Sequence, residues 1–170
     1  MISIRATRYC DIPDLPMIES SAGQAFLVIP ELAWVADDAV LSEAQHRQLL
    51  RIGQCWVVAD EHDRPCAFIA VRPGEDGLHI EELAVHADRQ RQGLGRALMQ
   101  HVIEVARQQG VVELTLTTFR DIAWNAPFYA RLGFRILEDH ELSAVLRNTL
   151  DTEVAHGFRR DSRCAMALPL

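Results

Sequence analysis

The stretch "RQRQGLGRALMQ", Arg89–Gln100, decides the fold because it joins a run typical of a β-strand to a run typical of a helix. A helix amino terminus presents unpaired backbone N–H groups and the positive end of the helix dipole, so it binds anions readily. Gly93 and Gly95 lack the Cβ atoms that would keep an anion away from the backbone, and glycine permits a positive φ where the chain curls. The stretch therefore predicts a turn that binds a pyrophosphate.

The spacing of the glycines separates this turn from two other nucleotide-binding motifs. The dinucleotide fingerprint requires G-x-G-x-x-G, but Leu98 occupies the position of the third glycine. A P-loop requires a lysine, and all 17 basic residues of this chain are arginine. The remaining pattern is Q-x-x-G-x-G, which runs from Gln90 to Gly95.

Hydrophobic periodicity around the turn predicts a mixed α/β sheet. Apolar or alternating runs typical of strands occupy residues 2–7, 55–60, 65–71, 78–85, 111–118, 133–142 and 163–170. Helical spacing or helix start signals mark residues 14–26, 30–50, 94–109, 125–133 and 143–158, with Ser42 as a candidate internal cap. The helix between the fourth and fifth strands predicts a parallel crossover, because parallel neighbours need a long connection.

The length and composition indicate one globular domain that spans residues 1–170. Apolar residues make up 49% of the chain, and no repeat or low-complexity segment divides it. The net charge of -7 argues against a nucleic-acid partner and suits a cationic small molecule or a basic peptide better. No apolar run approaches the length of a membrane span, and the amino terminus lacks the apolar core of a signal peptide. We therefore expect a cytoplasmic protein without a membrane partner.

The histidines and cysteines predict neither a metal site nor a covalent intermediate. The seven histidines show no H-E-x-x-H pattern, and the four cysteines show no C-x-x-C pair, so we expect no metal ion. Cys55, Cys66 and Cys164 lie in apolar, strand-like runs, which favours buried reduced thiols. Neither a reactive thiol nor a G-x-S-x-G serine is indicated.

A second motif, "WNAPFYARLGF" at residues 124–134, follows the glycine-rich turn at a distance of about thirty residues. Together the two motifs resemble the GNAT superfamily of acetyl-CoA-dependent N-acetyltransferases, and the resemblance covers residues 54–137 well and the rest loosely. It implies acetyl-CoA as the cofactor and direct transfer within a ternary complex. It also implies a mixed, mostly antiparallel central sheet with helices on both faces and a parallel crossover after the fourth strand.

The resemblance assigns residues to the cofactor in three places. Main-chain groups of Leu83 and Val85 would bind the pantetheine arm, with the Val85 N–H as the oxyanion donor. Asn125 and Phe128 would contact the cofactor, although a helix cap explains an asparagine at this position equally well. Tyr129 would protonate the departing thiolate, with a packed core tyrosine as the alternative. The turn would bind the pyrophosphate through Gln90, Arg91, Gln92, Gly93, Leu94, Gly95 and Arg96.

The base that accepts the ammonium proton has three candidates on the strand before the turn. In similar enzymes the positions of His79 and Glu81 face the acceptor, and strand alternation puts both on one face, so Glu81 is preferred and His79 follows. Glu82 is retained because a bulge would reverse the alternation. Some relatives carry a glutamate on the next strand, where this chain has Thr117. A solvated strand face explains the charged residues without any catalytic role.

Acceptor residues are expected in the regions where the resemblance is thin. Trp34 and Asp37 could hold a cationic amine by aromatic and charge contacts, although a solvated helix face explains them as well. Phe119, Arg120 and Trp124 lie on the loop before the second motif, where Arg120 could pair with an acceptor carboxylate.

Three hypotheses for the function follow, and the first is preferred. In the first, the chain acetylates the primary amine of a small molecule, such as an amine or an amino-acid-like compound. In the second, it modifies a protein lysine or amino terminus, which needs an open groove and not a closed pocket under residues 27–42. In the third, it is a non-catalytic CoA-binding sensor or interaction module. Because similar proteins are often homodimers, a homodimer is expected here too.

Overall fold

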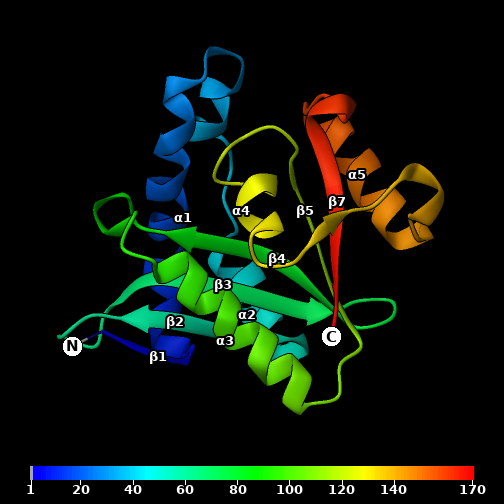
Figure 1. Ribbon diagram of the computed structural model, residues 1–170. Helices are drawn as coiled ribbons and strands as arrows, with labels where there is room; N and C mark the ends of the chain where they lie inside the picture. The colour runs from blue at the N-terminus through cyan, green and yellow to red at the C-terminus, as the bar shows by residue number, and fades with distance from the viewer. Residues whose placement is uncertain (1) are drawn as a thin grey trace. The chain divides into compact units, whose positions relative to one another are not determined.

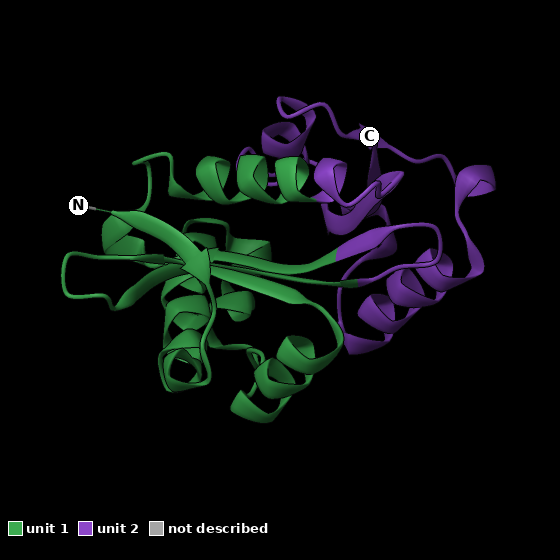
Figure 2. Cartoon of the chain, turned by 90° about the horizontal axis from the view of Figure 1, so that it is seen from below, with its two compact units in different colours: residues 1–72, 80–105 green, residues 73–79, 106–170 purple. Residues whose placement is uncertain are grey.

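The computed structural model describes residues 2–170, which pack into two compact units (Figure 2). Of the described residues, unit 1 comprises 2–72 and Ile80–Val105. Unit 2 comprises Pro73–His79 and Ala106–Leu170. Within residues 2–170, no helix combines the length and apolar character needed to cross a membrane.

Unit 1 contains the amino-terminal strands and the helices that cover them. Its strands are β1 (Ser3–Ala6), β2 (Gln54–Ala59), β3 (Pro65–Pro73) and β4 (Leu78–Val85), in this order across the sheet. β1 pairs antiparallel with β2, and β2 pairs antiparallel with β3. Its α-helices are α1 (Leu15–Gly23), α2 (Glu43–Ile52) and most of α3 (Leu94–Gln108). Its 3₁₀ helices are η1 (Tyr9–Asp14), η2 (Gln24–Val28), η3 (Pro30–Asp37) and η4 (Ala87–Arg89).

Alternation along the strands sends side chains to two covered faces, as expected from the sequence. On one face Val57 and Phe68, which are register partners, pack with Leu15 and Ile18 of α1. On the other face Trp56 meets His101 of α3, with ring centroids 5.3 Å apart. Helices therefore cover both faces of this part of the sheet (Figure 1).

The start of α2 confirms the predicted cap at Ser42. The Ser42 hydroxyl accepts a hydrogen bond from Gln45 N, and the Gln45 side chain accepts one from Ser42 N, which completes a capping box. The residues before this cap differ from expectation in the type of helix, because residues 24–28 and 30–37 form the 3₁₀ helices η2 and η3 and not parts of the α-helices expected at 14–26 and 30–50. Pro30 stands at the start of η3, where its missing N–H would have no helical partner.

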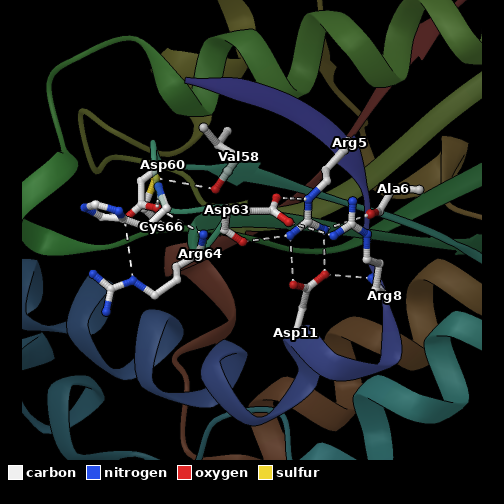
Figure 3. Close-up of polar contacts among 10 residues, drawn as sticks. Arg5, Ala6, Arg8, Asp11, Val58, Asp60, Asp63, Arg64 and Cys66 are labelled. Atoms are coloured by element: carbon white, nitrogen blue, oxygen red, sulfur yellow. Dashed lines mark hydrogen bonds and ion pairs between the residues drawn. The ribbon is translucent and has the colours of Figure 1, made fainter. Parts of the chain in front are cut away.

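An ion-pair cluster fastens β1 to the segments beside it (Figure 3). Arg5 donates two hydrogen bonds to the Asp11 carboxylate, at 2.7 and 3.0 Å, and a third to Asp63 at 2.8 Å. Arg8 donates to the second oxygen of Asp63. Although burial raises the pKa of Asp11, hydrogen bonds from Arg5 and from the Arg8 N–H outweigh it and hold that pKa below its usual range. The cluster joins β1, η1 and the β2–β3 turn.

Unit 2 holds the carboxy-terminal strands. They are β5 (Glu113–Phe119), β6 (Arg135–Ile136) and β7 (Arg163–Pro169), with β7 antiparallel to both others. The first residues of β4 pair parallel to β5, which confirms the crossover predicted after the fourth strand. The helices are α4 (Ala126–Ala130) and α5 (Ala144–His156), with the 3₁₀ helices η5 (Asp139–Glu141) and η6 (Arg160–Ser162). Leu142, Leu146 and Leu150 pack α5 and its start against Ala165 of β7.

Two strand predictions in unit 2 are wrong in extent. The strand expected at residues 133–142 is only the two residues of β6. Glu141 explains this, because its carboxylate pairs with Arg135 and accepts from Glu138 N, which turns the chain out of the sheet. The strand expected from residue 111 begins at Glu113, and Val112 is left 64% exposed instead of joining Leu114 on the buried face.

Candidate active site

The glycine-rich turn lies between η4 and α3, as its sequence predicted (Figure 1). Gln90 Nε2 donates to the Val85 carbonyl at 3.1 Å, so this side chain ties the turn to the end of β4. Gln92 Nε2 donates to the Asp88 carbonyl at 3.3 Å. The first backbone bond of α3 runs from Ala97 N to the Gly93 carbonyl at 2.9 Å. The N–H groups before Ala97 are therefore the unpaired donors of a helix start.

The backbone of the turn takes the left-handed conformation at two residues. Gly93 has φ +79°, and a Cβ added there would meet no atom within 4 Å. The second residue with positive φ is Arg91, at 59°, and not Gly95, which lies in the first turn of α3. A left-handed residue followed by a right-handed one, as at Gly93 and the helical Leu94, points neighbouring N–H groups into one concave surface that binds anions.

The charges beside the turn have the sign that an anion requires. Arg89, Arg91 and Arg96 flank Gly93, and they form no ion pair with any residue between 2 and 170. A phosphate oxygen can accept both from the helix-start amides and from these guanidinium groups. The open space at Gly93, the free amides and the arginines together fit a pyrophosphate.

β4 contains an irregularity at the candidate bases. Phe68 of β3 and Ala84 of β4 belong to the same buried cluster under α1, and alternation along β3 puts Arg72 on that face too. Arg72 Nε donates to Glu81 Oε2 at 2.6 Å, which places Glu81 on the same face as Ala84. Residues three apart lie on opposite faces of a regular strand, so a β-bulge separates Glu81 from Ala84. The regular alternation assumed from the sequence is therefore wrong.

The three candidate bases differ in their surroundings. Glu81 is ion-paired with Arg72, and its side chain is 33% exposed. Glu82 is half-buried and follows it at the break in alternation. In unit 2, His79 is buried, and its Nδ1 lies 2.9 Å from Thr115 Oγ1. The ring of His79 is thereby held in one orientation.

In unit 2 the second motif forms α4 and its flanks. Pro127 stands at the helix start and Gly133, with φ 101°, ends the turn that follows, as predicted. Tyr129 is 9% exposed, and its ring meets Phe128 and Phe134 edge-on, with centroids 5.0 and 5.9 Å away. Contacts with Phe128 and Phe134 therefore hold the Tyr129 ring, and with it the phenolic hydroxyl, in place.

Asn125 does not act as the helix cap that its position suggests. Its side chain makes no capping hydrogen bond, and its Oδ1 is buried without a hydrogen-bond partner among residues 2–170. Because an unsatisfied buried oxygen costs about 1–3 kcal/mol, such an atom in a native site calls for a donor from a ligand or a water. This orphaned oxygen supports a cofactor contact in place of the capping alternative.

The expected acceptor residues are found in both units. In unit 1, Trp34 and Asp37 lie on η3, where both are exposed. In unit 2, Trp124 is 42% exposed, and the backbone N of Arg120 donates to the Ser162 carbonyl. Phe119 differs from expectation, because it is buried with its ring below the Arg163 guanidinium and against Phe158.

Sequence reasoning missed two carboxylates that the fold places in polar networks. Glu19 on α1 accepts a hydrogen bond from Leu41 N at 3.0 Å, and burial together with nearby Asp38 raises its pKa to about 7. In unit 2, Glu153 of α5 accepts from Thr117 Oγ1 at 3.0 Å and pairs with Arg163 at 2.9 Å. Thr117 occupies the position where some relatives carry a glutamate. In this chain that position therefore contacts a carboxylate that comes from α5, a helix distant in sequence. The sequence offers a signal only for Glu19, which directly follows Ile18, one of the apolar residues that α1 turns to the core. It offers none for Glu153.

Residues 25–134, more than half of the chain, match the Acetyltransferase (GNAT) family. The chain therefore belongs to this family, which confirms the resemblance inferred from the two motifs. It is an acyltransferase that uses acetyl-CoA as donor. In unit 1 the free amides and arginines of the turn fit the pyrophosphate of this cofactor.

Two proteins of known activity and one solved structure are similar to this chain. The [ribosomal protein bS18]-alanine N-acetyltransferase of Salmonella typhimurium is 32% identical over 108 residues, which are 64% of this chain and 66% of that protein. Peptidyl-lysine N-acetyltransferase YjaB of Escherichia coli is 28% identical over 90 residues, 53% of this chain and 55% of that protein. This chain thus spans two thirds or less of their lengths.

The PaiA N-acetyltransferase of Thermoplasma acidophilum, solved in complex with coenzyme A, shares the fold with a TM-score of 0.69. It is 13% identical, with 100% of this chain and 99% of that chain covered.

Proposed function

We propose that this N-acetyltransferase modifies a primary amine of a protein, either an α-amino terminus or a lysine side chain. The observation that carries the choice is the exposure of apolar side chains in residues 24–38, where Leu27 is 53% and Val28 78% exposed. Side chains that enclose a small amine would be withdrawn from water, whereas an open surface suits a polypeptide. The two relatives named above act on a ribosomal protein alanine and on peptidyl-lysine, which favours the same acceptor class.

The proposed chemistry is direct transfer, for which acetyl-CoA supplies an activated acetyl thioester. The amides of residues 93–96 bind its pyrophosphate, and Asn125 Oδ1 accepts a hydrogen bond from the pantetheine arm. The Val85 N–H stabilises the developing oxyanion. Tyr129 donates its phenolic proton to the leaving thiolate. Burial raises the pKa of the Cys55 thiol to about 11, which disfavours it as a covalent nucleophile.

The base is proposed among the three residues of β4. The ion pair with Arg72 occupies one oxygen of Glu81 and favours a role in holding the strand. Glu82, which lies at the break in alternation, is therefore preferred as the proton acceptor. Glu81 is the second candidate and His79 the third. The pH dependence of kcat/KM separates them, because loss of the true base removes the acidic limb of the profile. Glu81→Gln, Glu82→Gln and His79→Gln would each be compared with the wild type.

A small-molecule amine is the second candidate acceptor. The exposed Trp34 and Asp37 on η3 favour it, because an indole face and a carboxylate can together hold a small ammonium ion. This acceptor class was the first expectation from the sequence. If the acceptor is a small molecule, turnover with free amines should be at least as high as turnover with any peptide.

Thiol release from acetyl-CoA tests both candidates. Peptides with a free α-amino group, peptides with a blocked terminus and one lysine, and free amines would be compared at equal concentrations. Tyr129→Phe should lower kcat about 100-fold while acetyl-CoA still binds. Tyr9→Phe is the matched control, because Tyr9 is the other tyrosine of the chain and is 63% exposed. Turnover on free amines alone would overturn the protein acceptor.

A further inference from the structure

The pyrophosphate turn is preceded by η4, a short 3₁₀ helix that packing alone does not fix. None of the three residues of η4 is buried, and Ala87 and Asp88 are exposed. The segment therefore depends on hydrogen bonds for its position. Because Gln90 follows η4 directly, a displacement of η4 also displaces the turn.

The backbone amides of residues 86–90 all have hydrogen-bond acceptors, and most of these acceptors are local. Arg89 N and Gln90 N donate to carbonyls within the segment, at 2.8 and 3.3 Å. Asp88 N donates to the ring Nδ1 of His86, also at 3.3 Å. His86 N donates to the Cys66 carbonyl of β3, the strand beside β4, at 2.9 Å. These bonds fix the shape of η4 and its attachment to the sheet.

The remaining amide, that of Ala87, is bound by a side chain from a different part of the fold. Ser21 Oγ accepts from Ala87 N at 2.9 Å, across 66 residues of sequence. Ala87 is the first residue of η4, so no carbonyl of the same helix faces its N–H. The Ser21 hydroxyl thus satisfies a donor that η4 itself leaves unpaired.

Ser21 belongs to α1, a helix that is anchored in the core of unit 1. Ile18 of α1 is 1% exposed and packs with Ala84 of β4, and Ala22 packs against the same cluster. Ala84 lies three residues before Ala87, so α1 contacts the end of β4 and bonds to η4 within one helical turn (Figure 1). The Ser21 hydroxyl is therefore a fixed point against which η4 is placed.

We infer that Ser21 is a positioning residue for the acetyl donor. Its hydroxyl holds η4, and through η4 it holds the turn at Gly93 where the unpaired amides meet the pyrophosphate. The inference rests on the proposed pyrophosphate contacts of residues 93–96 and adds a residue that acts on them through η4. Without the Ser21 acceptor, Ala87 N would bond to water, and the turn would sample more positions before the cofactor binds. Ordering the turn would then oppose binding.

A purely structural role for this hydrogen bond predicts a different result. Loss of the bond would then lower the free energy of unfolding but leave the affinity for coenzyme A unchanged, because the folded turn would be the same. Thermal unfolding and cofactor affinity, measured on the same variants, therefore separate the two roles.

The test measures the dissociation constants of coenzyme A and pantetheine by calorimetry, with pantetheine as a competitor and no acceptor present. Pantetheine lacks the pyrophosphate and the nucleotide, so it reports on the rest of the site. Ser21→Ala should raise the Kd of coenzyme A about fivefold, the effect of one hydrogen bond, and change that of pantetheine less than about 1.5-fold. Ser21→Thr keeps the hydroxyl and should return the Kd of coenzyme A to within about twofold of the wild type.

Ser20→Ala is the matched control. Ser20 is the neighbouring serine of α1, and it is exposed. The two variants make the same change in helix propensity, so a difference between them belongs to the hydroxyl that meets Ala87. Ser20→Ala should leave both dissociation constants unchanged.

Ala87→Pro removes the donor of the same hydrogen bond. Proline is accepted at the first position of a helix, and His86 has φ -52° and ψ 138°, which suits the residue before a proline. If Ser21 acts through Ala87 N, then Ser21→Ala in the Ala87→Pro background should change the Kd of coenzyme A less than about 1.5-fold. A loss of about fivefold that persists in this background would overturn the inference, because Ser21 would then act by another route.

The remaining outcomes separate this inference from the assignment on which it rests. A lower Tm with an unchanged Kd of coenzyme A in Ser21→Ala would overturn the role of Ser21 while leaving the pyrophosphate turn intact. The same change of Kd in Ser20→Ala would do so too. Equal wild-type affinities for coenzyme A and pantetheine would overturn the pyrophosphate contacts and, with them, this inference.

Discussion

Replacing Glu19 by glutamine should stabilise the protein, with a gain that grows as pH rises from about 4.5 and is largest above about pH 7. Glu19 is a partly buried carboxyl whose pKa is raised from 4.5 to about 7, first by burial and then by the charge of Asp38. The hydrogen bond that it accepts from Leu41 N lowers the pKa and only partly offsets these effects. A glutamine keeps an oxygen for Leu41 N but never ionises.

The sign and size follow from proton linkage. Below about pH 4.5 the carboxyl is protonated in both the folded and unfolded states, so it costs nothing. As pH rises to about 7, the unfolded state ionises first, and the free energy of unfolding falls. At 1.36 kcal/mol per pH unit the loss is about 3 kcal/mol, which partial solvent exposure reduces to about 2 kcal/mol.

The assay is thermal unfolding of the wild type and Glu19→Gln across pH. A gain of about 2 kcal/mol raises Tm by about 6 °C in a chain of this length at about pH 8, and the difference should shrink to near zero at about pH 4. Glu61→Gln, in the exposed β2–β3 turn, should show no such trend. A Tm difference that stays constant across this range, or a loss of stability at pH 8, would refute the reasoning.

Two further predictions concern the backbone of the turn and the ion pair in unit 2. Gly93→Ala and Gly110→Ala both place a side chain at positive φ with no atom within 4 Å, so each should cost about 1 kcal/mol of stability. Only Gly93→Ala should also raise the KM for acetyl-CoA, by about tenfold, and an equal KM in both variants would contradict the pyrophosphate assignment. Arg163→Met leaves the partly buried Glu153 carboxylate without its charged partner, with Thr117 Oγ1 as the remaining donor, and should cost about 2 kcal/mol in urea unfolding. The double variant Arg163→Met with Glu153→Leu should recover most of that loss of stability. If the losses of the two single variants instead add up in the double variant, the two side chains are not coupled.

Local patterns in the sequence determined the order of elements, the pyrophosphate turn and the family. The glycines of residues 89–100, the Ser42 cap and the stop at Gly133 each depend on backbone sterics or hydrogen bonds between near neighbours, so a short stretch contains the whole cause. The same local reasoning failed where a competing contact existed. β6 ends early because Glu141 binds Arg135 and Glu138.

Tertiary structure alone decided how the side chains of the candidate site are used. The bulge between Glu81 and Ala84 is visible only from contacts with a neighbouring strand and helix, and it reverses which residues share a face. Asn125 has the sequence of a cap, yet its oxygen is buried without a partner. Glu153 reaches Thr117 from 36 residues away. Burial, pairing and pKa depend on groups brought together from distant parts of the chain, and the spacing of residues carries no information about those distances.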